Sequence, residues 1–276
     1  MKVESTAQPR PHPVVGSQLV RRWDPVGQAT VEVVLVHGIG EHSGRYERTG
    51  GLLAGEGFGV TAADLIGCGA TGGKRAYVEQ WAHFLDQVQV FVEEARAKAV
   101  PTVLMGHSMG GLISLEYALA KRPRPDLLVL SAPGLDGGAG WQKAIAPLLG
   151  RLVPRFKAPN TLKGEQLSRD PDVGEAYFAD PLVHTASTVR LGAELFAAME
   201  RTRSTMMSLD VPTLVLHGGA DSIVPPTATV ELGNLPNVER RLYPTLRHEI
   251  LNEPEGPEIV AAIAEWVRSQ IAGVVS

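Results

Sequence analysis

Several residue types that mark other protein classes are scarce in this chain of 276 residues. There is one cysteine, Cys68, so no internal disulfide bond can form and no metal-ligand spacing is present. No apolar run approaches the roughly 20 residues of a membrane-spanning helix, and residues 1–13 are polar, unlike a signal peptide. The formal net charge is −4 without a run of lysine or arginine, which argues against nucleic-acid binding. We therefore expect a cytoplasmic protein with no bound metal and no nucleic-acid partner.

The composition itself, with 44% hydrophobic and 20% charged residues, is typical of a globular protein. Short β-rich apolar runs alternate with segments of helical spacing, which predicts an α/β fold with a mostly parallel central sheet and helices on both faces. The predicted strands are 31–36, 58–63, 103–105, 127–130, 213–216 and 238–242, and the predicted helices include 45–54, 78–95, 112–119 and 259–271.

One region breaks this alternation. Between residues 134 and 209 there are helical patches and a stretch rich in proline and aspartate, but no convincing pair of strands. An unstructured loop of that length is improbable in a compact domain. The sequence therefore predicts a core of residues 1–133 and 210–276, with residues 134–209 inserted as a mainly helical cap.

The most informative motif is G-x-S-x-G at residues 106–110, which follows a predicted strand and precedes a predicted helix. This order is typical of a nucleophile elbow, a sharp turn that presents a serine hydroxyl to substrate. Gly106 and Gly110 would let neighbouring backbone approach closely. By itself the motif could also be an ordinary glycine turn, but its setting favours Ser108 as a nucleophile.

A serine hydroxyl is a weak nucleophile at neutral pH and needs a base, with an acid to orient that base. His248 lies in the loop after the last predicted strand, and Asp221 follows strand 213–216. The chain order Ser108, Asp221, His248 is that of an α/β-hydrolase triad. Asp221 could instead cap the following turn, and Asp136, after strand 127–130, is the alternative acid.

Acyl transfer also requires hydrogen-bond donors for the oxyanion. The glycine-rich loop after strand 31–36 would supply the backbone N–H of Ile39, and the residue after the nucleophile, Met109, would supply the other. The alternative for this loop is a glycine turn that serves only to reverse the chain.

These motifs together resemble the monoacylglycerol lipase and lysophospholipase-like branch of the α/β-hydrolase superfamily, in its bacterial type. The resemblance extends from about residue 15 to 270 and implies hydrolysis of a single-chain glyceride or related ester under a small cap, with no metal or other cofactor. It also implies that Glu41 and Arg45 lie near the alcohol-binding end. The segments that carry it are HGIGEHSGRY at 37–46, GHSMGG at 106–111, the loop of His248, SRDP at 168–171 and DPLVH at 180–184.

One segment departs from this family. Where the family usually shows D-x-R-G-H-G-x-S, residues 64–71 read DLIGCGAT, which keeps the glycines and lacks the arginine and the histidine. The triad is untouched, so the difference bears on acyl or alcohol preference.

The leading hypothesis is a serine hydrolase that cleaves carboxylic esters, with monoacylglycerols as the first candidate substrates. Ser108 would attack the ester carbonyl, His248 would transfer the proton, and Asp221 would orient His248. The alternatives are a short-chain carboxylesterase, an acyltransferase, amidase or peptidase with the same triad, and a catalytically silent ligand-binding module. The partner would be a lipid ester, with transient contact of the cap with a membrane or micelle. Acyl length, positional preference and oligomeric state are not encoded in any recognisable motif.

Overall fold

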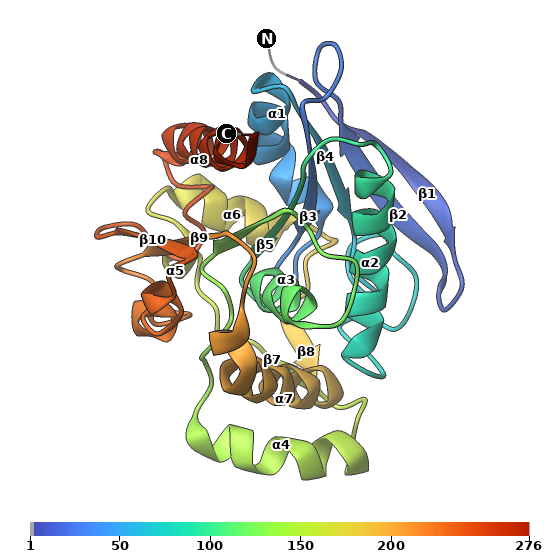
Figure 1. Ribbon diagram of the computed structural model, residues 1–276. Coiled ribbons are helices and arrows are strands. Elements are labelled where there is room, and N and C mark those ends of the chain that lie inside the picture. The colour runs from blue at the N-terminus through green and yellow to red at the C-terminus, as the bar shows by residue number, and fades with distance from the viewer. Residues whose placement is uncertain (1–2, 276) are drawn as a thin grey trace.

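Eight strands form the central sheet of this computed structural model, which describes residues 3–275 (Figure 1). They are β1 (Thr6–His12), β2 (Gly16–Trp23), β3 (Val31–Val36), β4 (Phe58–Ala63), β5 (Thr102–His107), β6 (Leu127–Ser131), β9 (Thr213–Gly218) and β10 (Val238–Tyr243). Their order in the sheet is β1-β2-β4-β3-β5-β6-β9-β10. The pairs from β4 to β10 are parallel, whereas β1 pairs with β2 and β2 with β4 in antiparallel fashion. The predicted fold class is confirmed.

Helices cover both faces of the sheet (Figure 1). One face carries α1 (Glu47–Gly55) and α8 (Gly256–Val275), and the other carries α2 (Ala82–Arg96), α3 (Met109–Leu119) and α7 (Val189–Thr205). Successive side chains of a strand point to opposite faces, so Val34 and Leu104 join the core cluster beneath α2 and α3, while Val33 and Val103 join the cluster beneath α1 and α8. Burial on both faces explains why these strands read as continuous apolar runs.

The segment between β6 and β9 is mainly helical. It contains α4 (Gly140–Leu152), β7 (Lys157–Pro159), α5 (Gly164–Leu167), α6 (Pro171–Ala179), β8 (Ala186–Thr188), α7 and a 3₁₀ turn, η2 (Met206–Ser208). Helix α4 packs on α7 at the greatest distance from the sheet (Figure 1). Strands β7 and β8 pair antiparallel, so the expectation of no strand pair in this region was wrong. Each has three residues, too few for an alternating pattern to show.

The N-terminal hairpin was not predicted. Strand β1 lies at the edge of the sheet, is mostly exposed, and contains Pro9 and Pro11. Proline is tolerated at an edge because one side of an edge strand has no ladder partner. The low hydrophobicity of β1 therefore reflects its position rather than an absence of structure.

Four parallel strands of the sheet end at one edge, where their loops meet. These strands are β3, β5, β9 and β10, and the loops that follow them contain all of the predicted catalytic groups. The loop after β3 leads through η1 (Ser43–Tyr46) into α1, and η3 (Pro226–Thr229) and η4 (Leu232–Asn234) connect β9 to β10. None of the helices within residues 3–275 is both long enough and apolar enough to span a bilayer.

Candidate active site

Ser108 occupies a strained turn between β5 and α3. Its backbone angles are φ 53° and ψ −119°, in a region that residues other than glycine rarely adopt. Its N–H donates to Ser131 O at 3.0 Å, which fixes the turn against β6. The flanking glycines are required, since a Cβ on Gly106 would lie 2.3 Å from Gly110 O and one on Gly110 would lie 2.1 Å from Val36 O. The local sequence therefore enforces an elbow that presents the Ser108 side chain to a cavity.

The cavity has a volume of about 310 Å³ and lies at the carboxyl edge of the sheet. Ser108 and His248 both line it, so the structure brings the predicted nucleophile and base to one space. Residues from the loop after β3 and from segment 134–209 complete its walls. Among its lining residues are Gly38, Ile39, Glu41, His107, Asn160, Thr161, Leu167, Tyr177, Ile223 and Glu249.

His248 and Asp221 form a close pair behind this cavity. The His248 Nδ1 lies 2.7 Å from Asp221 Oδ2, and the other carboxylate oxygen accepts the N–H groups of Ile223 and Val224 at 2.8 and 2.9 Å. Burial acts to raise the pKa of Asp221, but hydrogen bonds from His217 and His248 outweigh it and hold that pKa below its usual range. A carboxylate only accepts, so Nδ1 carries the proton and Nε2 of His248 is left as the basic nitrogen.

Part of segment 134–209 holds the loop of His248 in place. The His248 N–H donates to Gln166 O at 3.4 Å, and the buried Glu253 accepts the N–H of Arg247 at 2.8 Å and the hydroxyl of Ser168 at 2.9 Å. Arg247 in turn donates to Ser168 O at 2.9 Å. Segment 166–169 is therefore bonded to the histidine loop and not merely laid over it.

The loop after β3 lies directly beside Ser108. A Cβ on Gly38 would stand 3.3 Å from the Ser108 Cβ, which shows how closely this backbone approaches Ser108. Ile39 lines the cavity, and Met109 is the first residue of α3, where N–H groups have no intrahelical acceptor. Gly40, with φ +76°, accepts the N–H of His184 at 2.7 Å. This hydrogen bond ties the loop after β3 to segment 134–209.

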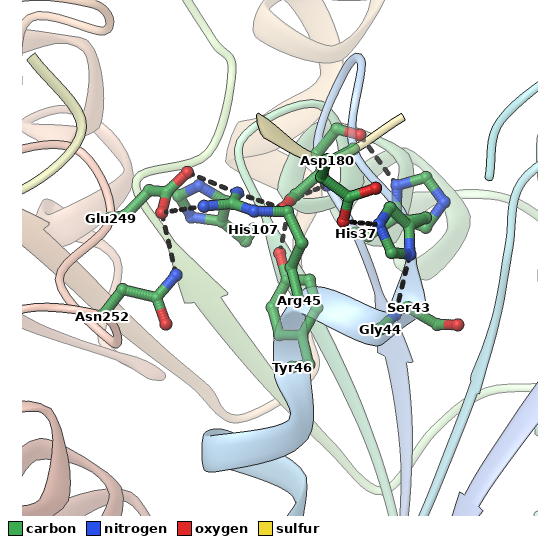
Figure 2. A network of polar contacts seen from close by, with 12 residues as sticks. His37, Ser43, Gly44, Arg45, Tyr46, His107, Asp180, Glu249 and Asn252 are labelled. Carbon is green, nitrogen blue, oxygen red and sulfur yellow. Dashed lines mark hydrogen bonds and ion pairs between the residues drawn. The ribbon is translucent and has the colours of Figure 1, made fainter. Parts of the chain in front are cut away.

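A buried polar network supports this loop (Figure 2). Glu41 Oε1 accepts the N–H of Gly38 and the hydroxyl of Tyr46, both at 2.6 Å, and Oε2 accepts from Arg45 at 2.7 Å. Arg45 also binds both carboxylate oxygens of Glu249, at 2.6 and 2.8 Å. Burial would raise the pKa of Glu41, but Arg45, His107, His37 and the hydrogen bond from Tyr46 together outweigh it and lower that pKa to about 2.

Glu41 and Arg45 were predicted near the alcohol-binding end. Glu41 faces the cavity, whereas Arg45 lies behind it, paired with two carboxylates and with its guanidinium 4.7 Å from the centre of the Tyr177 ring. Direct contact of either with substrate stays a prediction. Sequence reasoning missed Glu249, whose only signal was its place beside the candidate base, and Tyr177, whose buried hydroxyl has no hydrogen-bond partner among the described residues.

Two other histidines in the site are buried. His107 lies beside His248, with 4.8 Å between the ring centres, and burial together with that neighbour lowers the pKa of His107 to about 4. His37 accepts the N–H of Leu65 at 2.9 Å through Nε2 and contacts Gly38 O at 2.8 Å through Nδ1. His37 therefore joins the loops after β3 and β4, a structural role.

The alternative acid is placed elsewhere. Asp136 pairs with Lys143 at 2.8 Å on α4, and its carboxylate is over one-third exposed. His248 already has Asp221 as its carboxylate partner. Within residues 3–275 no group of three or more histidine, cysteine, aspartate or glutamate side chains is arranged to hold a metal ion.

The unusual loop 64–71 is held by its aspartate. Asp64 accepts the N–H of Ser43 and of Ala70, both at 2.8 Å, and the Ser43 hydroxyl at 2.5 Å. Ile66 and Cys68 are buried in the core cluster beside α2. Burial raises the pKa of the Cys68 thiol to about 12, so it behaves as a packing residue.

A second, apolar cavity adjoins the catalytic one. Its volume is about 640 Å³, and it lies between α4, α7 and the β7–β8 pair. It shares four lining residues with the catalytic cavity, namely Gln142, Pro159, Asn160 and Ser187. The two cavities are therefore adjacent, and the second is lined largely by apolar side chains.

Comparisons with known proteins agree with this geometry. The family profile described as serine aminopeptidase, S33 (Hydrolase_4), matches residues 27–255. The monoacylglycerol lipase of Mycolicibacterium smegmatis is 32% identical over 258 residues, covering 90% of this chain and 92% of the relative. The phospholipase YtpA of Bacillus subtilis is 32% identical over 238 residues, covering 83% of this chain and 92% of the relative.

Solved structures give the same result. The monoacylglycerol lipase of Paleococcus ferrophilus superimposes with a TM-score of 0.83 at 34% identity, covering 91% of this chain and 99% of that one. A soluble variant of the monoglyceride lipase of Saccharomyces cerevisiae superimposes with a TM-score of 0.88 at 22% identity, covering 98% and 96%, a likeness of fold. The chain therefore belongs to the Hydrolase_4 family and is a monoacylglycerol-lipase-like α/β-hydrolase.

Proposed function

We propose that this protein hydrolyses monoacylglycerols through an acyl-enzyme formed on Ser108. At the level of reaction class, the predicted carboxylic ester hydrolase is confirmed by the lipases and esterases to which the chain is similar. The finer proposal is carried by one observation: Ser108 and His248 line a cavity that shares four wall residues with an apolar cavity between α4 and α7. A polar reaction centre next to an apolar chamber suits an ester with one acyl chain.

The reaction follows from the placement of the groups. Ser108 Oγ attacks the ester carbonyl while His248 Nε2 accepts its proton, and Asp221 stabilises the imidazolium through Nδ1. The N–H groups of Ile39 and Met109 would bind the oxyanion of the tetrahedral intermediate. His248 then donates the proton to the departing glycerol oxygen, leaving the acyl group on Ser108. Water, deprotonated by His248, releases the fatty acid and restores the serine.

The polar end of the cavity suits a glycerol head. The hydroxyl of Tyr177 is buried and unpartnered among the described residues, and the side chains of Asn160 and Thr161 stand nearby in the cavity lining. The Tyr177 hydroxyl itself has almost no surface open to the cavity, because it points toward the backbone of Gly40. We infer that Asn160 and Thr161 offer the hydrogen bonds to a hydroxyl of the alcohol.

A peptidase with the same triad is less compatible with the cavity. An aminopeptidase needs an available anion to hold the amino terminus of a peptide. Among the described lining residues the carboxylates are Glu41 and Glu249, and both are bound to Arg45. The three groups keep a net charge of −1, but both carboxylates already accept from Arg45, and Glu41 also accepts from Gly38 and Tyr46. An ammonium group would have to displace these donors, so a neutral alcohol suits the cavity better.

We further propose that residues 134–209 form a cap, set on a core of residues 1–133 and 210–276. Its helix α4 exposes Leu148 and Leu152 by 61% and 69%, and apolar faces of this kind favour transient contact with a micelle or membrane. A cytoplasmic location stays a prediction.

The test is release of glycerol from medium- and long-chain monoacylglycerols, run beside p-nitrophenyl butyrate and a triacylglycerol. Wild type is compared with Ser108→Ala and with Ser114→Ala, which removes a buried hydroxyl from α3 that has no described partner. We expect preferential glycerol release that survives in Ser114→Ala and disappears in Ser108→Ala.

Other outcomes separate the alternatives. Cleavage of the butyrate alone would indicate a short-chain esterase, and full activity of Ser108→Ala would overturn the mechanism. Labelling of wild type, but not of Ser108→Ala, by a fluorophosphonate would exclude a silent ligand-binding module.

A further inference from the structure

Asp221 has a second histidine partner. His217, at the end of β9, is completely buried, and its Nε2 lies 3.2 Å from Asp221 Oδ2 and 3.0 Å from Val224 O. The same oxygen, Oδ2, lies 2.7 Å from Nδ1 of His248. One carboxylate oxygen therefore contacts two imidazole rings, of which the catalytic scheme uses one.

The surroundings of His217 determine which of its nitrogens is protonated. Nε2 faces a carboxylate oxygen and a carbonyl oxygen, and both of these only accept, so Nε2 must carry a hydrogen. Nδ1 lies 3.2 Å from the hydroxyl of Thr229, which can donate to it. His217 can thus act as a neutral donor toward Asp221.

The Thr229 hydroxyl is itself held by β10. Arg240 Nε donates to Thr229 Oγ1 at 2.9 Å, and Arg240 Nη2 donates to Pro226 O at 2.9 Å. The Thr229 hydroxyl has two acceptors within reach, Pro226 O at 3.1 Å and His217 Nδ1 at 3.2 Å. Pro226 O also accepts from Arg240, so donation by Thr229 to His217 Nδ1 is the arrangement that leaves neither acceptor without a donor. The result is a chain of donors that runs from Arg240 through Thr229 and His217 to the carboxylate.

We propose that His217 is a positioning residue, oriented by Thr229, which holds the Asp221 carboxylate in place and shares its Oδ2 with His248. The proposal rests on the triad assigned under the proposed function. Asp221 Oδ1 is fixed by two backbone N–H groups, and His217 fixes Oδ2, so the carboxylate presents one orientation to the catalytic base.

Removal of the His217 donor has a defined consequence. Oδ2 would then interact with His248 alone, which favours the protonated form of His248. When the pH is lowered, the variant would therefore begin to lose activity at a higher pH than wild type does. The other groups that face His248 would be unchanged: His107 from β5, Glu249 from its own loop and Glu41 from the loop after β3.

The experiment compares five variants over about pH 5 to 9, the range in which histidines titrate. His217→Leu removes the donor and His217→Gln keeps an N–H at a similar reach. Thr229→Val removes the hydroxyl that fixes the tautomer and Thr229→Ser keeps it. Thr213→Val is the control, since Thr213 is equally buried on β9 but its hydroxyl donates to Val211 O, away from the triad.

Two measurements are made: the rate of fluorophosphonate labelling of Ser108, and kcat and KM for a soluble ester. We expect His217→Leu and Thr229→Val to move the acid limb of both profiles upward by about 0.5–1 pH unit. At neutral pH kcat should fall by about tenfold, the effect of one hydrogen bond to a charged group, with KM unchanged. His217→Gln and Thr229→Ser should lie close to wild type.

Two results would overturn the proposal. One is that, on acidification, His217→Leu and Thr229→Val lose activity at the same pH as the control Thr213→Val. The other is an equal loss in His217→Gln, which would indicate that only the shape of the ring matters. If His217→Leu does not fold, the comparison of Thr229→Val with Thr229→Ser still tests the proposal. Failure of the triad itself would appear separately, as residual activity and labelling in Ser108→Ala.

Discussion

Arg45 binds Glu249 through two guanidinium nitrogens, at 2.6 and 2.8 Å, and binds Glu41 at 2.7 Å. Glu41 in turn accepts the N–H of Gly38 beside Ser108, and Glu249 follows His248 in the chain. The pairing therefore joins the loop after β3, which contains the proposed oxyanion donor Ile39, to the loop that carries His248.

We expect Arg45→Met to lower kcat/KM by the same factor for monoacylglycerols and for p-nitrophenyl butyrate. Hydrolysis of either substrate requires the loop after β3 and the loop of His248 to keep their relative positions. Removing the cation leaves two buried carboxylates unpaired, a loss of about 3–5 kcal/mol of stability. Thermal unfolding and the two activities check this. Arg268→Met is the control, since that side chain pairs with Glu56 at the surface. A loss confined to glycerol esters would instead place Arg45 in direct contact with the alcohol.

The buried titratable groups predict two separate windows of acid sensitivity. Glu41 has a pKa near 2 in the fold and 4.5 as its reference value, so its stabilisation is complete above pH 4.5 and is lost as pH falls toward 2. His107 has a pKa near 4 against a reference of 6.5, so the unfolded chain binds more protons between these values. Stability should then fall as pH drops from 6.5 to 4.

The free energy of unfolding measured against pH tests these windows. We expect His107→Gln to flatten the curve between about pH 4 and 6.5, and Glu41→Gln to flatten it below about pH 4.5 while lowering the plateau. Unchanged slopes in both variants would contradict the assigned windows.

The nucleophile elbow predicts a contrast between two glycines. Gly110→Ala would place a methyl group 2.1 Å from Val36 O, in backbone that cannot move aside cheaply, so we expect a loss of more than about 3 kcal/mol of stability. Gly192→Ala, near the start of α7 and with no atom within 4 Å of the new carbon, should gain up to about 1 kcal/mol. Denaturant unfolding measures both. Equal effects would refute the close approach at the elbow.

The sequence predicted the sheet because its parallel strands are buried on both faces and read as apolar runs. It did not predict the hairpin of β1, which is exposed and contains prolines, and β2, which is buried at only three of its eight positions. It also missed β7 and β8, which are three residues long. Local patterns report burial, and these strands have little of it.

In the candidate site too, local patterns identified some residues, while others could be recognised only from the tertiary structure. Ser108, Asp221 and His248 could be proposed because each follows a strand at the edge where the loops converge. The sequence places His217 only at a strand end before two glycines, since its contact with Asp221 depends on how the loop after β9 folds back. Tyr177 comes from a helix that no local pattern directs toward the cavity, so its place in the cavity wall required the tertiary structure.

Substitutions on the two faces of α4 should distinguish selection of acyl chain length from binding to a lipid surface. Leu149 lines the apolar cavity, whereas Leu148 and Leu152 point to solvent. Leu149→Trp would fill part of that cavity. We expect kcat/KM for long-chain monoacylglycerols to fall by about tenfold or more, because each excluded methylene forfeits about 0.8 kcal/mol of burial, with butyrate cleavage retained.

Leu148→Gln with Leu152→Gln would leave the cavity intact and remove apolar area from the exposed face. We expect unchanged hydrolysis of a monoacylglycerol held below its micellar concentration, but weaker binding to phospholipid vesicles and slower hydrolysis of substrate in micelles. Vesicle co-sedimentation and assays on either side of the micellar concentration make the comparison. If the double variant loses activity equally in both assays, the outer face of α4 serves folding or packing instead of contact with lipid.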